Sequence, residues 1–350
     1  MTSFFRRKTF LGLLFFSVSF YGLQAQSDLT NFLQAGKEDA SKLMSSYMDP
    51  IVVGLSYGLN GGWYHTAKAH KTLGFDIGVS FNAVFIPSSH NTFRPGDLNL
   101  ANTQLISPTS GDVPTVVGPE VDSEYETSLV TPAGTQTISF DGPPGLDFKD
   151  KFKISGVLAP TVQVGLGIYK NTDLKFRFVP EQSFDDTKIG LIGFGLMHDI
   201  KQHIPGLKLL PFDLSVLAGY TKISGSVGME GLFDKPANDL AKQEMNFEIN
   251  AWLFQALISK KIAIITFYGG IGYNAVKSSS DVTGSYVIYE DSQNSSNNVT
   301  IKDPVSLAFK NNSFRLTGGI RFNLGPLYLN GDYSIQEYNT LSVGLGFAFR

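Results

Sequence analysis

Alternation of large apolar residues with small or polar ones is the dominant pattern of this chain. The last strand shows it most clearly, because Leu341, Val343, Leu345, Phe347 and Phe349 alternate with small or polar residues. A period of two indicates a β-strand with one apolar face. A final strand rich in aromatics, in a chain that opens with a secretory leader, predicts a β-barrel in a bacterial outer membrane.

The same period recurs along most of the chain. Clear strands are predicted over 72–85, 152–168, 212–221, 314–324 and 327–335, with weaker ones over 173–180, 187–200, 245–259 and 262–277. A globular strand usually has ~5–6 residues, whereas a membrane strand needs ~9–11. Several of these runs are of the longer kind. We therefore predict an all-β fold, an antiparallel transmembrane β-barrel of about 10–14 strands. A soluble β-sandwich is the rival class.

The lengths of the links between strands support this prediction. The long links, at 87–150, 224–244 and 278–312, fall on one side of the predicted sheet, and most short links fall on the other. Outer-membrane barrels have short periplasmic turns and long outer loops. The simplest count is ten strands with both ends in the periplasm. Hairpins within 87–150 or around 286–301 would raise it to twelve or fourteen. Segment 87–150 is expected to be either a solvated outer loop or a ligand or partner surface.

The N-terminal part divides into three segments. Residues 1–25 have the charged start, apolar run and small-residue cleavage site of a signal peptide. An amphipathic helix is predicted from Ser27 to Asp49, where Pro50 would end it. If Ile51–Leu59 were the first strand of the barrel, the long and short links would exchange sides. We therefore assign 26–70 to a plug or periplasmic cap and 71–350 to the barrel, although Ile51–Leu59 could instead be an ordinary first strand. The predicted plug residues are Phe32, Leu33, Leu43, Met44, Tyr47 and Trp63.

Charged residues on the polar faces of the strands are the candidate functional residues. A Lys or Arg facing lipid at mid-bilayer would cost ~2–4 kcal/mol, so these charges should face inward. They could line a pore, or they could form ion-pair ladders that fill a narrow barrel, which we favour at this strand number. The lumen-lining candidates are Asp76, Lys153, Lys175, Arg177, Asp213, Glu248, Arg315, Arg321 and Asp332.

The composition argues against several other chemistries. The chain of 350 residues has no Cys, which excludes disulfides and thiolate metal sites, and its net charge of −3 does not favour nucleic acid. His65 and His70, like His198 and His203, are five residues apart, which is not a metal-site spacing, so we expect ordinary turn histidines. Without a nucleophile motif, we expect no enzyme activity, no cofactor and no metal site.

Two groups of motifs carry a resemblance to a known type of protein. The first comprises Tyr47–Pro50, Gly54–Tyr64 and Leu73–Asp76; the second comprises His198–Gly206, Leu210–Asp213 and Ala218–Tyr220. Both resemble a family of uncharacterised outer-membrane barrels of Bacteroidota-type bacteria. The layout is also similar to that of FadL-type barrels, which import hydrophobic molecules through a barrel closed by an N-terminal hatch. No ligand-binding residue of those proteins maps onto a numbered position here.

These observations lead to two functional hypotheses. The first is passive transport of a small hydrophobic compound across the outer membrane, gated by Ser27–His70. The alternative is a membrane scaffold that anchors an exported or secretion-machinery partner. The expected partners are therefore outer-membrane lipid, a small hydrophobic ligand, and a periplasmic or exported protein.

Overall fold

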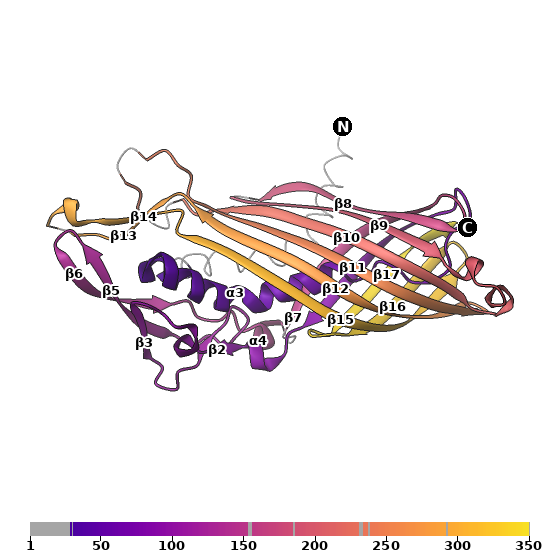
Figure 1. The fold of residues 1–350 in the computed structure, drawn as a ribbon, viewed down its shortest axis with the longest axis horizontal. Helices are drawn as coiled ribbons and strands as arrows, with labels where there is room; N and C mark the ends of the chain where they lie inside the picture. The colour runs from indigo at the N-terminus through magenta and orange to yellow at the C-terminus, as the bar shows by residue number, and fades with distance from the viewer. Residues whose placement is uncertain are drawn as a thin grey trace.

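Ten antiparallel strands close into a barrel (Figure 1). The computed structural model describes residue 29 and residues 31–152, 156–184, 186–230, 234–236, 239–291 and 293–349. Around the barrel the order is β1 (Phe75–Phe85), β17 (Thr340–Phe349), β16 (Leu327–Ile335), β15 (Val305–Leu324), β12 (Ile265–Thr283), β11 (Glu244–Ile262), β10 (Asp213–Gly228), β9 (Thr187–Asp199), β8 (Thr172–Phe184) and β7 (Gly156–Gly167). The predicted fold and the simplest strand count are confirmed.

The two ends of the barrel differ in their connections. Turns such as 263–264 and 325–326 join strands at one end, where β1 begins and β17 finishes; we call this the short-turn end. The link from β9 to β10 also lies there and contains two short 3-10 helices, η4 (Lys201–His203) and η5 (Leu207–Leu209). The opposite end carries the long links and is called the long-loop end.

Strand β15 shows that the polarity of the barrel wall reverses along its height. In the part nearer the short-turn end, Leu316 and Ile320 are exposed on the outer face, and Arg321 is buried inside. Nearer the long-loop end, Phe309 is buried inside and Lys310 is exposed outside. The apolar belt therefore covers only part of the wall, and the long strands continue beyond it into water.

Aromatic side chains mark the edge of this apolar belt that lies nearer the long-loop end. The rings of Tyr220 and Trp252 lie 4.7 Å apart, and those of Tyr273 and Phe314 lie 5.3 Å apart. Aromatic girdles of this kind occupy the interfaces of membrane barrels. The strand faces predicted over 73–85, 212–221, 314–324 and 327–335 are confirmed. The strand predicted over 152–168 begins only at Gly156, because Phe152 ends helix α4 and 153–155 lie outside the described residues.

The N-terminal helix differs from the prediction in length and position. A 3-10 turn, η1 (Asn31–Ala35), leads into α3 (Gly36–Leu59), and Pro50 lies inside the helix. The predictions that Pro50 ends the helix and that Ile51–Leu59 could be a strand are wrong. Burial on both sides of Pro50 outweighs the ~3 kcal/mol that a mid-helix Pro costs. Among the described residues, no helix combines the length and hydropathy needed to cross a bilayer.

Helix α3 lies in the long-loop half of the barrel and extends beyond it (Figure 1). The helix therefore lies away from the short-turn end, which the link lengths predict to be the periplasmic side. The helix contacts the inner wall through Gly54 and Gly58. A Cβ at Gly58 would lie 2.6 Å from Cβ of Ala159 on β7, and one at Gly54 would lie 3.0 Å from Cγ2 of Val157. The two glycines therefore allow the helix to approach β7 closely.

Residues 87–150 fold into a cap over the helix rather than an extended solvated loop. The cap contains η2 (Ser88–His90), β2 (Thr92–Phe93), η3 (Pro95–Leu98), β3 (Thr103–Ser107), β4 (Val113–Pro114), β5 (Ser123–Thr131), β6 (Gly134–Gly142) and α4 (Phe148–Phe152). Sheets β3–β5–β6 and β2–β4 are separate from the barrel, as is the hairpin of β13 (Ser285–Tyr289) and β14 (Val299–Lys302). A further 3-10 turn, η6 (Ser295–Asn297), lies in that hairpin loop. Additional hairpins exist, but they add no strand to the barrel, so the counts of twelve and fourteen are wrong.

An apolar core joins the helix to the cap. Phe32 packs edge-on against Tyr47 and Tyr125, with ring centroids 6.1 and 5.8 Å apart, and Leu43 is fully buried beside them. The inward side chains of the long-loop half, such as Phe309, belong to the same core. The hydrophobic effect therefore holds the helix, the cap and the protruding strands together.

Candidate functional site

A second N-terminal element fills the short-turn half of the barrel. Residues 60–74, called here the lumen segment, follow α3, run through the lumen and lead into β1. Its aromatic and histidine side chains are buried: Trp63, Tyr64, His65 and His70 are each at most 5 % exposed. The segment has no regular structure beyond turns and bends, so its backbone groups need partners from the barrel wall.

Two arginines from the wall bind the end of helix α3. Arg177 on β8 donates to the carbonyl oxygens of Leu59 and Gly61, both at 2.7 Å, and Arg315 on β15 donates to that of Asn60 at 3.0 Å. The last carbonyls of a helix lack intrahelical partners and carry the negative end of its dipole. Buried cations at this position therefore satisfy the carbonyls and fix the helix end to opposite sides of the wall.

The indole ring of Trp63 packs between Arg177 and two glycines of neighbouring strands. The Arg177 guanidinium lies 3.7 Å from the indole ring centre, a cation–π contact. A Cβ at Gly195 on β9 would lie 2.6 Å from the indole, and one at Gly219 on β10 would lie 2.7 Å from it. Only glycine leaves room for the ring at these positions. Nothing in the sequence connected these glycines with Trp63.

His65 links the lumen segment to both β1 and β15. Its Nδ1 lies 2.7 Å from Nη1 of Arg321, and its Nε2 lies 2.9 Å from a carboxylate oxygen of Asp76. Because arginine only donates, Nδ1 is the acceptor, and Nε2–H donates to Asp76. The imidazole also lies over Tyr328, with ring centres 4.2 Å apart. These contacts require a neutral imidazole of one tautomer.

His70 fixes the part of the lumen segment nearest the short-turn end to β8. Its backbone N–H and its Nδ1 approach the two carboxylate oxygens of Asp173, at 2.8 and 2.9 Å. Asp173 is fully buried. The expectation of ordinary turn histidines is therefore wrong for His65 and His70, which are buried and paired with carboxylates. His203 lies in the turn helix η4, and His198 lies near the end of β9, with their Nε2 atoms 2.9 Å apart.

The structure brings most of the predicted lumen charges together. The following are buried and face inward: Asp76, Lys175, Arg177, Arg315, Arg321 and Asp332. Asp213 is half-buried near the short-turn end, 3.5 Å from Oγ of Ser259, and Lys153 lies outside the described residues. Glu248 does not face the lumen. It lies on the outer face of β11 beyond the apolar belt and pairs with Lys222, because polar residues face water on that part of the wall.

The predicted plug residues lie in two different places. Trp63 is in the lumen, as described above. Phe32, Leu33, Leu43, Met44 and Tyr47 instead belong to the core between helix and cap at the long-loop end. The short-turn half of the lumen is therefore filled by the segment after the helix, and the end of the helix fills the long-loop half.

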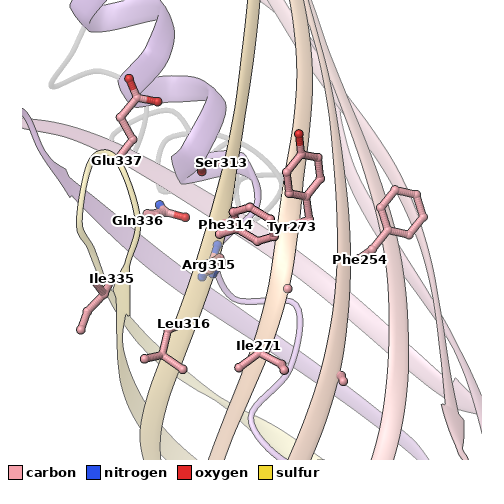
Figure 2. Close-up of a pocket in the computed structure, with 12 residues that line it drawn as sticks. Phe254, Ile271, Tyr273, Ser313, Phe314, Arg315, Leu316, Ile335, Gln336 and Glu337 are labelled. Carbon is pink, nitrogen blue, oxygen red and sulfur yellow. The ribbon is translucent and has the colours of Figure 1, made fainter.

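The barrel wall is incomplete in its long-loop half. Strands β7 and β8 pair over only five residue pairs, from Gln163–Arg177 to Gly167–Asp173, although each strand is much longer. On the other side, β16 ends at Ile335 while β15 continues to Val305. A groove of about 880 Å³ lies there, lined by apolar residues such as Phe254 and Phe314 and reaching Arg315 and Gln336 (Figure 2).

Helix α3, the cap and the barrel meet beside this groove. Tyr57 on α3 donates to Glu337, and Tyr338 lies 2.8 Å from Nδ1 of His90 in the cap. Asp49 on α3 interacts electrostatically with both His90 and Glu337. Burial raises the pKa of the Asp49 carboxyl, Glu337 raises this pKa further, and His90 opposes the rise. We call Asp49, Tyr57, His90, Glu337 and Tyr338 the junction.

These features define a class: a closed ten-stranded barrel with an apolar outer belt and a lumen filled by its own N-terminal segment. The chain belongs to the family of unknown function DUF6588, which matches residues 5–349. No curated protein matches the sequence.

Solved structures with a similar arrangement are bacterial outer-membrane proteins. The translocator domain of the autotransporter NalP from Neisseria meningitidis has 10 % identity and a TM-score of 0.32, covering 87 % of this chain and 99 % of that one. Ail of Yersinia pestis has 7 % identity and a TM-score of 0.27, covering 79 % and 99 %. The protease OmpT from Escherichia coli has 10 % identity and a TM-score of 0.26, covering 79 % and 96 %. Scores this low carry no functional argument. The likeness to FadL-type barrels stays a prediction.

Proposed function

We propose that this protein is a bacterial outer-membrane barrel that passes a small hydrophobic compound, with its N-terminal segment as the gate. The observation that carries the proposal is the apolar interior of the long-loop half. There Leu55 and Leu59 of α3 pack against inward side chains of β8 to β12, including Leu191 and Ile249. An interior of this kind suits an apolar ligand, whereas a pore for polar solutes would be lined with polar groups.

The geometry of the filled lumen suggests a direction for the route. The lumen segment is held by Arg177, His65 and His70 across the short-turn half, so passage along the whole axis would require many hydrogen bonds to break at once. Passage of the compound through the incomplete wall, beside β15 or between β7 and β8, would not require these hydrogen bonds to break. We therefore place the route between the long-loop end and the bilayer, through the wall.

In this mechanism helix α3 moves relative to the wall when ligand binds. A ligand shifts the gate only if it binds the open state better than the closed one. The contacts of Gly54 and Gly58 with β7 are small and apolar, so they can be remade at another position more readily than directional polar contacts can.

Locking the helix tests this proposal. Oγ of Ser56 on α3 lies 3.4 Å from Oγ of Ser278 on β12, and the chain has no Cys of its own. We expect the double variant Ser56→Cys/Ser278→Cys to form a disulfide and to lose uptake of a hydrophobic dye into vesicles under oxidising conditions, with recovery after reduction. The matched control is Thr103→Cys/Thr127→Cys, which crosslinks β3 to β5 within the cap at hydroxyls 3.0 Å apart.

Equal dye uptake by the locked and reduced forms would exclude a moving helix gate. Loss of uptake in the cap control as well would show that the disulfide disturbs the fold rather than the gate.

The alternative function is a membrane scaffold for an exported or secretion-machinery partner. The folded cap favours it, because sheet β3–β5–β6 projects from the barrel at the long-loop end (Figure 1). Mild crosslinking followed by affinity capture would distinguish the two. A stoichiometric partner that is lost when 87–150 is replaced by a short linker would favour the scaffold, and its absence would disfavour it.

A further inference from the structure

We propose that the β9–β10 turn, residues 200–212, is a binding surface for anionic phospholipids of the bilayer leaflet at the short-turn end. This inference does not depend on the transport proposal, because it concerns the opposite end of the barrel and a different ligand.

The position of the turn follows from the strands that it joins. Leu196 on β9 and Val216 on β10 are exposed on the apolar outer face. The turn begins four residues after Leu196 and ends four residues before Val216. It therefore emerges at the edge of the apolar belt nearer the short-turn end, where lipid headgroups lie around a membrane barrel.

The turn exposes apolar side chains that water alone would not favour. Leu209 is 91 % exposed, Leu210 is 41 % exposed and Ile204 is 38 % exposed. Single exposed apolar residues are ordinary, but three within seven positions form a patch. At the edge of a lipid-facing belt, such a patch fits the boundary between headgroups and acyl chains.

Hydrogen bonds build the turn into a fixed shape. Lys201 donates through Nζ to the carbonyl oxygens of Leu210 and Phe212, and its backbone N–H donates to Asp199 at 2.9 Å. Gln202 donates to the carbonyl oxygens of Lys170 and Asp199, both at 2.8 Å. The apolar side chains are thus presented by a braced loop, which lowers the entropy lost when they insert into lipid.

Positive charge surrounds this patch. Lys208 lies within the turn, and Lys170 lies in the turn bonded to it. Lys260 and Lys261 lie at the end of β11, just beyond its pairing with β10, and all four lysines are exposed. The acidic residues that flank the turn, Asp199 and Asp213, both contact neighbouring groups. Lysines that flank an apolar patch at a membrane interface attract anionic headgroups.

The long-loop end carries exposed acidic residues as well as lysines. Its cap exposes Glu120, Asp122 and Glu124, which would repel phosphate. The charge difference between the two ends therefore favours phosphodiester headgroups at the short-turn end. Because the patch combines lysines with exposed leucines, it suits a lipid with its acyl chains better than free phosphate.

The first experiment measures the depth of the turn in a bilayer. A polarity-sensitive fluorophore is attached to Leu209→Cys, and the matched control is Leu240→Cys, which is 94 % exposed at the long-loop end. In vesicles of mixed phosphatidylglycerol and phosphatidylcholine, we expect the label at 209 to be shifted to the blue and shielded from iodide, and the label at 240 to remain accessible. Equal accessibility of the two labels would overturn the proposal. Shielding at 209 that requires an added soluble protein would assign the surface to a protein and would also overturn it.

The second experiment tests the preference for anionic lipid. Native mass spectrometry of the full barrel in detergent would count retained phosphatidylglycerol against phosphatidylcholine. We expect Lys208→Gln/Lys260→Gln/Lys261→Gln to reduce the preference by at least ~10-fold, because each lysine near an anionic surface contributes to binding. The control Lys277→Gln/Lys302→Gln/Lys310→Gln removes the same charge from exposed positions toward the long-loop end. An equal preference in both variants and the wild type would overturn the proposal.

Discussion

The two halves of strand β15 place opposite kinds of residue on the same face. In the short-turn half Leu316 points outward and Arg321 inward, whereas in the long-loop half Lys310 points outward and Phe309 inward. The backbone and the pairing with β12 continue unchanged through the reversal. The reversal is what a change of surroundings from hydrocarbon to water requires, because each medium selects the face that meets it.

The interiors of the two halves are held by different forces. In the short-turn half, the lumen segment is fixed by directional polar contacts such as those of Arg177 and His65. In the long-loop half, α3 and the cap are held by apolar packing. Polar networks specify one arrangement, while apolar contacts tolerate small shifts. The comparison therefore places rigidity at one end of the barrel and adaptability at the other.

The largest expected effect comes from removing the arginine that binds the helix end. Arg177→Met would leave the buried carbonyls of Leu59 and Gly61 without their donor, at ~1–3 kcal/mol for each stranded group. We expect a loss of ~2–6 kcal/mol, measured by denaturant unfolding in vesicles. The control Lys222→Met removes an exposed pair and should change stability by less than ~1 kcal/mol. Equal effects of the two variants would contradict the conclusion that the hydrogen bonds of Arg177 hold the helix end in place.

A truncation in the apolar half should act locally. Leu43→Ala opens a cavity in the core between helix and cap, where Leu43 is fully buried. Such changes cost ~2–5 kcal/mol. We expect faster hydrogen exchange in α3 and residues 87–150, with little change in β16 and β17. Faster exchange throughout the barrel would show that the two halves are not independent.

A lysine scan along one face of β15 tests the reversal of polarity. Leu316→Lys would place a charge in the apolar belt at ~2–4 kcal/mol. Ala308→Lys places the same charge on the same outer face beyond the belt, where we expect almost no change. Folding yield and unfolding midpoint in vesicles give the comparison. A similar loss at both positions would mean that the belt continues to the long-loop end.

The smallest expected effect is a pH dependence at the junction. Burial raises the pKa of Asp49, so this carboxyl favours the folded state while protonated and loses that contribution as pH rises through its folded-state pKa. Asp49→Asn should therefore match the wild type at about pH 3 and be more stable at about pH 7. Unfolding at both pH values measures this difference. Lower stability of the variant at neutral pH would show that the charged carboxylate is favoured instead.

The strands were predictable because their pattern is local. Alternation along β17 or β1 identifies the outward face without knowledge of any neighbour. Link lengths then led to the count of ten. Glu248 was misplaced for a physical reason: inward polarity holds only within the apolar belt, and β11 continues beyond it.

Contacts across long sequence separations were not predictable. Nothing local connects His70 with Asp173, which are 103 residues apart, or Arg177 with Leu59. Pro50 was misread because the local rule that Pro ends a helix gave way to burial on both sides of it. The cap was missed because the eight prolines of 87–150 suggested a solvated loop, although β5 and β6 have nine residues each.

Planar-bilayer conductance of the refolded full chain tests the central claim most directly. If the lumen segment fills the short-turn half, the wild type should show no steady channels, and Arg177→Met/Arg315→Met should show intermittent ones, because the segment loses the groups that hold the helix end. Steady channels from the correctly folded wild type, with no change in the double variant, would contradict the account.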